Sequence, residues 1–215
     1  MRRSLLLAVL LLATGACATV PERAYYPEPG EAETRLLATT LWRAAKAASE
    51  DPRQYSFAMI RCHDVSAYTV DDATFYFTQG LARQPAAVID ALVAHEVAHE
   101  LLGHAGQRRV LSVSLGAGFT ALGFAIPGAG LLDFVASPLI VRAFTREQEI
   151  AADLRAVEVL HDMGYESPRR AMADALSAAF KVNGPPRGGW LASEPKLKDR
   201  LTALEPLEPE KQAAK

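Results

Sequence analysis

Two histidines and a glutamate near the middle of the chain have a spacing that suits metal chemistry. His95, Glu96 and His99 form the pattern H-E-x-x-H. Residues four apart on a helix lie about one turn apart, so both imidazoles could bind one metal ion. The Glu96 carboxylate would then lie beside the open position of the ion, where it could take a proton from a water molecule that attacks a carbonyl group.

The alternative is a helix whose two histidines lie four residues apart by chance, because short patterns of this kind also arise without function. The neighbouring residues are mostly apolar, which predicts a buried helix: Ala91, Leu92, Val93, Ala94, Val97 and Ala98. Buried polar groups need partners, and a zinc ion would supply one. A metzincin site is excluded, because Leu102 and Ala105 occupy the positions of its glycine and its third histidine. The third ligand must come from elsewhere.

A later segment predicts a helix with two carboxylates on one face. Thr145 and Gln148 have the spacing of a capping box, so we expect a helix to begin there and to run to about Met163. Glu149 and Asp153 are four residues apart on this helix and therefore point in similar directions.

These motifs together resemble those of the gluzincin metallopeptidases of the forty-eighth metallopeptidase family. The matching features are HEVAH, a further histidine at His104, and E-x-x-A-D on a later helix. The family includes HtpX, the CAAX prenyl endopeptidases and small periplasmic lipoproteins. The resemblance implies that Glu149 is the third zinc ligand and that Asp153 orients a ligating histidine. His104 lies off the metal face, and we expect it to be a hydrogen-bonded structural residue.

Near the C-terminus the sequence departs from the family pattern at one position. The family usually has a histidine followed by proline in this loop and then an arginine. Glu194 stands in place of the histidine, and Arg200 matches the arginine. We assign both residues to an active-site loop. An ionised Glu194 could bind the metal in a resting state, but it could not donate a hydrogen bond to an oxyanion.

The segments before the metal helix predict one helix and two strands. Apolar residues recur at helical spacing over residues 31–49, which predicts a covering helix. Residues 55–61 and 74–79 are rich in aromatic side chains, and Phe75 and Phe77 alternate with other residues, which predicts strands. The strand at 74–79 could form a sheet edge along the cleft that binds an extended polypeptide, or it could be internal.

Residues 110–141 are strongly apolar, with Asp133 as the only charged residue. The segment is too short for two membrane spans of about 20 residues each. A single span would place the H-E-x-x-H motif and the later carboxylates on opposite sides of the bilayer. We expect two shorter helices, broken at Pro127 and Gly128, that pack either in the core or against a lipid surface.

The N-terminus has the layout of a secretory signal, with a basic start, an apolar run and small residues before Cys17. Its end resembles a bacterial lipobox. We expect residues 1–16 to be a lipoprotein signal peptide and residues 17–30 to be the lipidated Cys17 with an extended tether. Thr14 stands where the lipobox usually has leucine, so ordinary signal-peptidase cleavage at the Ala16-x-Ala18 pattern is the alternative.

Lipidation would anchor the protein in the outer membrane, facing the periplasm, because Ala18 rather than aspartate follows Cys17. Ordinary cleavage would give a soluble periplasmic protein instead. In the lipidated form Cys62 would have no cysteine partner, and we expect it to be a small buried apolar residue.

The remaining composition suits one globular domain over residues 31–205, followed by a disordered tail at 206–215. The 215 residues are 50% hydrophobic and 22% charged. With a net charge of −2 and no run of Lys or Arg longer than a pair such as Arg2 and Arg3, nucleic acid is not an expected partner.

The sequence therefore predicts an α+β, mostly helical zincin-like domain with a small sheet. One Zn²⁺ per chain would be held by His95, His99 and Glu149, and Glu96 would be the catalytic base for hydrolysis of internal peptide bonds. The resemblance implies polypeptide substrates such as misfolded envelope proteins. The alternatives are a zinc-stabilised envelope binding or chaperone-like lipoprotein with little turnover, and a structural lipoprotein without metal.

Overall fold

The structure, a computed structural model, describes residues 24–70, 73–104, 106–107, 144–185 and 195–209. Within these residues the strands form a four-stranded sheet with the order β1-β2-β4-β3. The strands are β1 (Ala24–Tyr25), β2 (Ser56–Ile60), β3 (Ala67–Val70) and β4 (Thr74–Thr78). β2 and β4 are parallel, whereas β1 and β3 are antiparallel to their neighbours, so the sheet is mixed.

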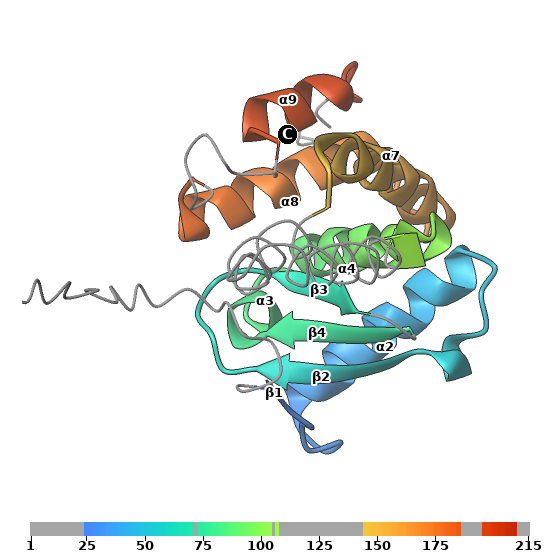
Figure 1. Cartoon of the computed structure of the whole chain (residues 1–215), viewed down its shortest axis with the longest axis vertical. Coiled ribbons are helices and arrows are strands. Elements are labelled where there is room, and N and C mark those ends of the chain that lie inside the picture. The colour runs from blue at the N-terminus through green and yellow to red at the C-terminus, as the bar shows by residue number, and fades with distance from the viewer. Residues whose placement is uncertain (1–23, 71–72, 105, 108–143, 186–194, 210–215) are drawn as a thin grey trace, which may run out of the picture.

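The described helices are arranged around α4, which lies between the sheet and the C-terminal helices (Figure 1). α4 contacts α2, β3, α7 and α8. The helices are α2 (Ala32–Ala47), the 3-10 turn η1 (Pro52–Gln54), α3 (Gln79–Ala82), α4 (Ala86–Leu101), α7 (Arg146–Asp162), α8 (Pro168–Asn183) and α9 (Leu197–Ala203). The predicted fold class, a mostly helical α+β domain with a small sheet, is confirmed.

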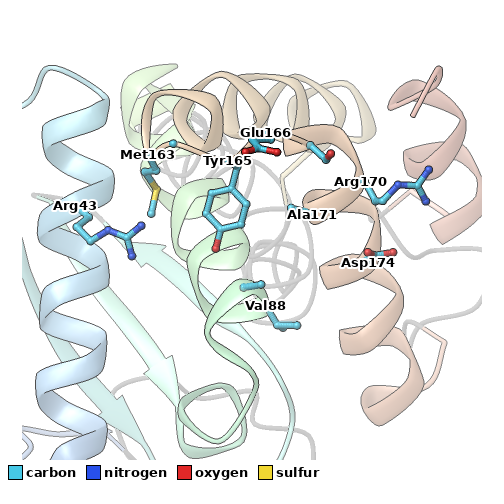
Figure 2. A pocket seen from close by; sticks show the side chains of 11 residues that line it. Arg43, Val88, Met163, Tyr165, Glu166, Arg170, Ala171 and Asp174 are labelled. Carbon is cyan, nitrogen blue, oxygen red and sulfur yellow. The ribbon is translucent and has the colours of Figure 1, made fainter. Parts of the chain in front are cut away.

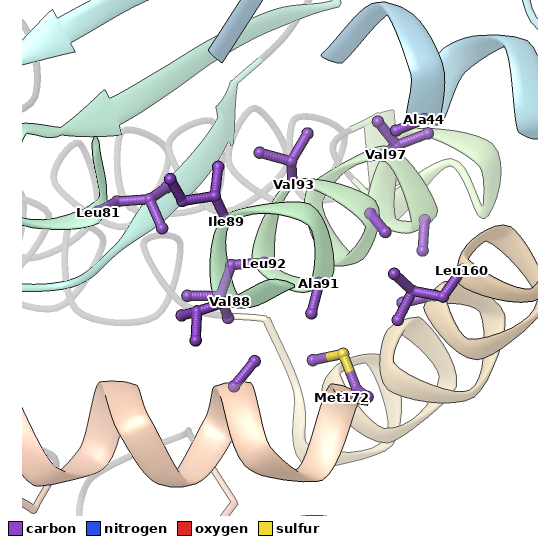
Figure 3. Close-up of a cluster of buried hydrophobic side chains, with 14 of the residues drawn as sticks. Ala44, Leu81, Val88, Ile89, Ala91, Leu92, Val93, Val97, Leu160 and Met172 are labelled. Carbon is purple, nitrogen blue, oxygen red and sulfur yellow. The ribbon is translucent and has the colours of Figure 1, made fainter. Parts of the chain in front are cut away.

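Helix α4 is buried from Val88 to His99, because apolar residues occur around its whole circumference. Ile89 lies near Leu81 on the side of the sheet, whereas Ala91 faces Leu160 of α7 and Met172 of α8 (Figure 3). This packing encloses the polar residues of the helix together with the apolar ones. His95, Glu96 and His99 are therefore all buried.

Strand β4 shows the predicted alternation, since Phe75 and Phe77 are fully buried. It lies between β2 and β3, however, so β4 is an internal strand. The suggestion that residues 74–79 form the sheet edge beside the site is wrong. The outermost described strand next to α4 is β3, which the sequence analysis did not predict. A four-residue strand gives too short an alternation to be distinguished from a loop.

Three of the predicted features lie outside the described residues: the lipidation site Cys17, the apolar segment 110–141 and Glu194. None of the described helices is both long and apolar enough to cross a membrane. Part of the predicted tail is described, and it packs against α8. The Glu208 carboxylate accepts hydrogen bonds from the backbone N–H groups of Arg169 and Arg170 at the start of that helix.

Cys62 differs from the expectation of an unpaired, buried residue. It is partly exposed, and its sulfur is disulfide-bonded. The only other cysteine of the chain, Cys17, lies outside the described residues. The partner of Cys62 is therefore not among the residues that the structure describes.

Candidate metal centre

Two helices from distant parts of the sequence bring the predicted site residues together. α4 carries His95, Glu96 and His99, and α7 packs against α4 with Glu149 in its first turn. The predicted capping box at the start of α7 is present, with reciprocal hydrogen bonds between Thr145 and Gln148. This cap fixes where α7 begins, and so which residues of its first turn face α4.

Three side-chain atoms converge with the spacing of ligands around one small cation. Nε2 of His95 lies 3.0 Å from Nε2 of His99, and these atoms lie 3.5 Å and 3.6 Å from the two carboxylate oxygens of Glu149. Ligands at ordinary Zn–N and Zn–O distances in a tetrahedron are roughly 3.3–3.6 Å apart. His95, His99 and Glu149 therefore fit zinc in donor type and in geometry.

Asp153 sets the orientation of His95. Its Oδ1 lies 2.9 Å from Nδ1 of His95, so Nδ1–H donates to the carboxylate and the lone pair of Nε2 faces the metal position. Asp153 is completely buried and also accepts from Arg200, at 2.7 Å from Nε and 2.6 Å from Nη2. The carboxylate is therefore held from two sides.

Arg200 was predicted to lie in an active-site loop, and the structure places it in the short helix α9. Besides Asp153, its guanidinium reaches Glu149, with Nη1 3.4 Å from Oε2. Arg200 thus contacts one candidate zinc ligand and the carboxylate behind another. The second residue of the predicted loop, Glu194, is not described.

His99 is held by two residues whose role the spacing of the motif did not reveal. Its Nδ1 lies 3.0 Å from Nδ1 of His104, and its ring stacks on Phe144 with centroids 3.8 Å apart. With Nε2 of His99 facing the metal position, Nδ1 of His99 carries the hydrogen and Nδ1 of His104 accepts it. His104 is hydrogen-bonded, as expected, but its partner is a candidate zinc ligand.

The charges of the candidate metal-binding cluster, which consists of His95, His99 and Glu149, depend on one another. Burial lowers the pKa of His95, but hydrogen bonds to Asp153 and Glu149 raise it to about 10 overall. Burial raises the pKa of Glu149, but the contacts with His95 and Arg200 lower it to about 2. Burial and the charge of His95 lower the pKa of His99 to about 2. Without a metal, His95 is therefore a charged imidazolium paired with the carboxylates of Asp153 and Glu149. A metal ion bound to Nε2 of His95 would replace the proton on that nitrogen.

Glu96 lies beside the candidate zinc ligands and accepts hydrogen bonds from strand β3. The hydroxyl of Thr69 lies 2.7 Å from Oε2 of Glu96 and 3.1 Å from its backbone carbonyl oxygen. Burial raises the pKa of the Glu96 carboxyl above its ordinary value, which suits a proton acceptor near neutral pH. Thr69 was missed by the sequence analysis, because a threonine in a short strand carries no signal of this contact.

A separate cavity of about 600 Å³ lies away from these residues (Figure 2). None of the metal-binding cluster, Glu96 or Thr69 lines it. It lies between α2, the first turn of α4, the connection from α7 to α8 and the first half of α8. Its lining residues are Arg43, Ala87, Val88, Met163, Gly164, Tyr165, Glu166, Ser167, Arg170, Ala171 and Asp174.

Comparison with known families agrees with the arrangement of these residues. The family model described as peptidase family M48 matches residues 31–208. The match includes both motif-bearing helices and Arg200, and it covers most of the chain. No match was found among curated proteins.

Proposed function

Because this chain belongs to peptidase family M48, we propose that it is a zinc-dependent metalloendopeptidase that hydrolyses internal peptide bonds. The observation that carries the proposal is the convergence of His95, His99 and Glu149 at distances that fit one Zn²⁺ per chain. The buried Glu96 beside this cluster supplies the base that hydrolysis needs.

Each residue of the site would have a separate role in peptide hydrolysis. Zn²⁺ would supply Lewis acidity, which polarises the scissile carbonyl and makes a water molecule more acidic. Glu96 would take a proton from the attacking water and pass it to the departing amine. Asp153 keeps Nδ1 of His95 protonated so that Nε2 is available as a ligand, and Arg200 holds Asp153 in place.

The test uses the full-length protein purified without chelators. We expect about one zinc per chain, and cleavage of an unfolded protein such as reduced casein by the wild type. Glu96→Gln should keep the zinc and lose nearly all cleavage, because the amide cannot accept the proton; removing a general base costs about 10²–10⁴-fold. Protein without zinc would refute both zinc-based functions. Equal cleavage by the wild type and the variant would show that the activity is a contaminant.

A zinc-binding protein with little or no turnover is the second candidate. The observation that favours it is Glu194, which stands where the family usually has a histidine able to stabilise an oxyanion. Stoichiometric zinc without cleavage by the wild type would support this envelope binding or chaperone-like role. In that case the unfolded protein should still bind to the wild type and to Glu96→Gln with equal affinity.

We also propose that the protein acts in the cell envelope, on misfolded envelope proteins, from a lipid anchor in the outer membrane. The signal-like N-terminus with Cys17 supports this location. A disulfide at Cys62 fits an oxidising compartment such as the periplasm. The sulfur of Cys17 cannot carry a lipid thioether and also pair with Cys62, so the two features compete if Cys17 is the partner.

Labelling with palmitate and sequencing of the N-terminus of the mature protein separate the lipidated form from the soluble one. A lipid-anchored protein incorporates the label, and Cys17→Ser loses it. If the label is absent and the mature chain begins at Thr19, cleavage at the Ala16-x-Ala18 pattern has removed Cys17 with the signal peptide. That result would favour the soluble periplasmic form.

A further inference from the structure

Strand β3, the outermost described strand beside α4, contacts the proposed catalytic base through the side chain of Thr69. Thr69 and Glu96 are both buried, with exposed fractions of 1% and 7%. The single hydroxyl hydrogen of Thr69 is shared between Oε2 of Glu96 at 2.7 Å and its backbone carbonyl oxygen at 3.1 Å. A hydroxyl donor at such a short distance from a carboxylate is a strong, charge-assisted hydrogen bond.

We infer that Thr69 is a positioning residue that orients Glu96 for proton transfer. Its hydroxyl holds Oε2 and leaves Oε1 as the oxygen that takes a proton from the attacking water. The same proton later passes from Oε1 to the departing amine nitrogen, while the Thr69 hydrogen stays on Oγ1 throughout. This inference rests on the proposed function, and it adds a residue on the sheet to the machinery carried by α4 and α7.

A second threonine shows what a purely structural contact of this kind looks like. Thr40 on α2 donates its hydroxyl to Oδ1 of Asp90, at 3.0 Å. The other oxygen of Asp90 accepts from Arg43 and Tyr165, so both oxygens of this carboxylate are used. Among the described residues, in contrast, Thr69 is the one donor to the Glu96 carboxylate, and it contacts Oε2. A carboxylate held at one oxygen is fixed in place but can still accept a proton at the other.

The experiment compares three variants of the full-length, zinc-loaded protein. Thr69→Val keeps the shape of the side chain but removes the hydroxyl, and we expect kcat to fall about 10- to 100-fold, as for other small misplacements of a reacting group. KM and the zinc content should remain close to those of the wild type. Thr69→Ser keeps a hydroxyl and should restore kcat to within a few-fold. Thr40→Val is the matched control, and its kcat per folded molecule should not change.

A Thr69→Val enzyme with wild-type kcat would overturn the inference, and so would a Thr69→Ser enzyme as slow as Thr69→Val. If the proposed function is wrong, the result is different, because the wild type would then cleave no faster than Glu96→Gln. That result would also refute the catalytic role of Thr69. The contact itself is tested without activity by a double-mutant cycle of Thr69→Val and Glu96→Met in urea unfolding, because methionine has no oxygen that could accept the Thr69 hydroxyl. Additive effects would show that the two side chains do not interact.

Discussion

The two histidine ligands of the candidate zinc site are oriented by different kinds of partner. Nδ1 of His95 donates to the carboxylate of Asp153, whereas Nδ1 of His99 faces the neutral ring of His104. A carboxylate stabilises a positive charge on the ring it contacts, and a neutral imidazole does so far less. The supporting residues of the two ligands should therefore contribute differently to metal binding and to stability.

Replacing His104 by alanine should weaken zinc binding. The change removes the acceptor for Nδ1–H of His99, and loss of such an outer partner typically costs about 10–100-fold in metal affinity. Zinc affinity can be measured by competition with a chelating dye. His161→Ala is the control, because His161 is exposed and contacts its neighbour Asp162. Unchanged affinity in His104→Ala would mean that Phe144 alone is sufficient to orient His99.

Replacing Arg200 by methionine should destabilise the fold. Asp153 is fully buried and would lose its two hydrogen bonds from the guanidinium. Because His95 still contacts the Asp153 carboxylate, we expect a loss of about 1–3 kcal/mol of unfolding free energy, the usual cost of an unmet buried hydrogen-bonding group, which urea titration can measure. Arg53→Met is the matched control, because Arg53 also binds an aspartate through two nitrogens but does so in solvent. Similar losses in both variants would contradict the structural role assigned to Arg200.

At the scale of the elements, α4 serves the core and the site at the same time. Its apolar residues pack against α2, the sheet, α7 and α8, and its polar residues face Glu149 and Thr69 from the neighbouring elements. Any change in how the sheet packs on α4 should therefore alter the position of Thr69 relative to Glu96. The connection between β4 and α4 contains Gly80, whose backbone approaches the loop before β3 closely.

Gly80 in α3 lies directly against the backbone of the loop before β3. A Cβ atom at this position would clash with the carbonyl oxygens of His63 and Asp64. Since backbone atoms cannot move aside easily, Gly80→Ala should lower the unfolding free energy by about 1–3 kcal/mol or more. Gly30→Ala is the control, because open space surrounds Gly30, and a change of more than about 0.5 kcal/mol is not expected there. Equal stability of the two variants in urea would contradict the close approach at Gly80.

At the scale of the whole molecule, the metal-binding cluster connects helices that come from both halves of the chain. Zinc would bind the folded protein and not the unfolded chain, so it should stabilise the fold by about 2.7 kcal/mol at a free concentration of about 100 times Kd. Removing zinc with a chelator should lower the melting temperature, and adding zinc back should restore it. Calorimetry of the wild type with and without chelator measures this difference.

Two variants make the chelator experiment specific. Glu96→Gln retains all three proposed ligands and should lose as much stability with chelator as the wild type does. His99→Ala lacks one ligand and should melt at nearly the same temperature with and without chelator. A melting temperature of the wild type that does not respond to chelator would contradict a structural contribution of the metal.

The sequence alone determined the features that depend on local periodicity. The H-E-x-x-H spacing places His95 and His99 on one face because a helix repeats every 3.6 residues. The same reasoning predicted that Glu149 and Asp153 share a face, and the capping box predicted where α7 begins. The buried pair Phe75 and Phe77 followed from the two-residue repeat of a strand.

Contacts between distant segments were decided only by the tertiary structure. The stacking of Phe144 on His99, the hydrogen bond from Thr69 to Glu96 and the contacts of Arg200 depend on how helices and strands pack against α4. The order of the described strands, in which β3 and not β4 is outermost, could not be predicted from the sequence either. A local repeat shows which face of an element is apolar, but not which element covers that face. The packing of these faces therefore decided which polar residues meet at the candidate metal centre.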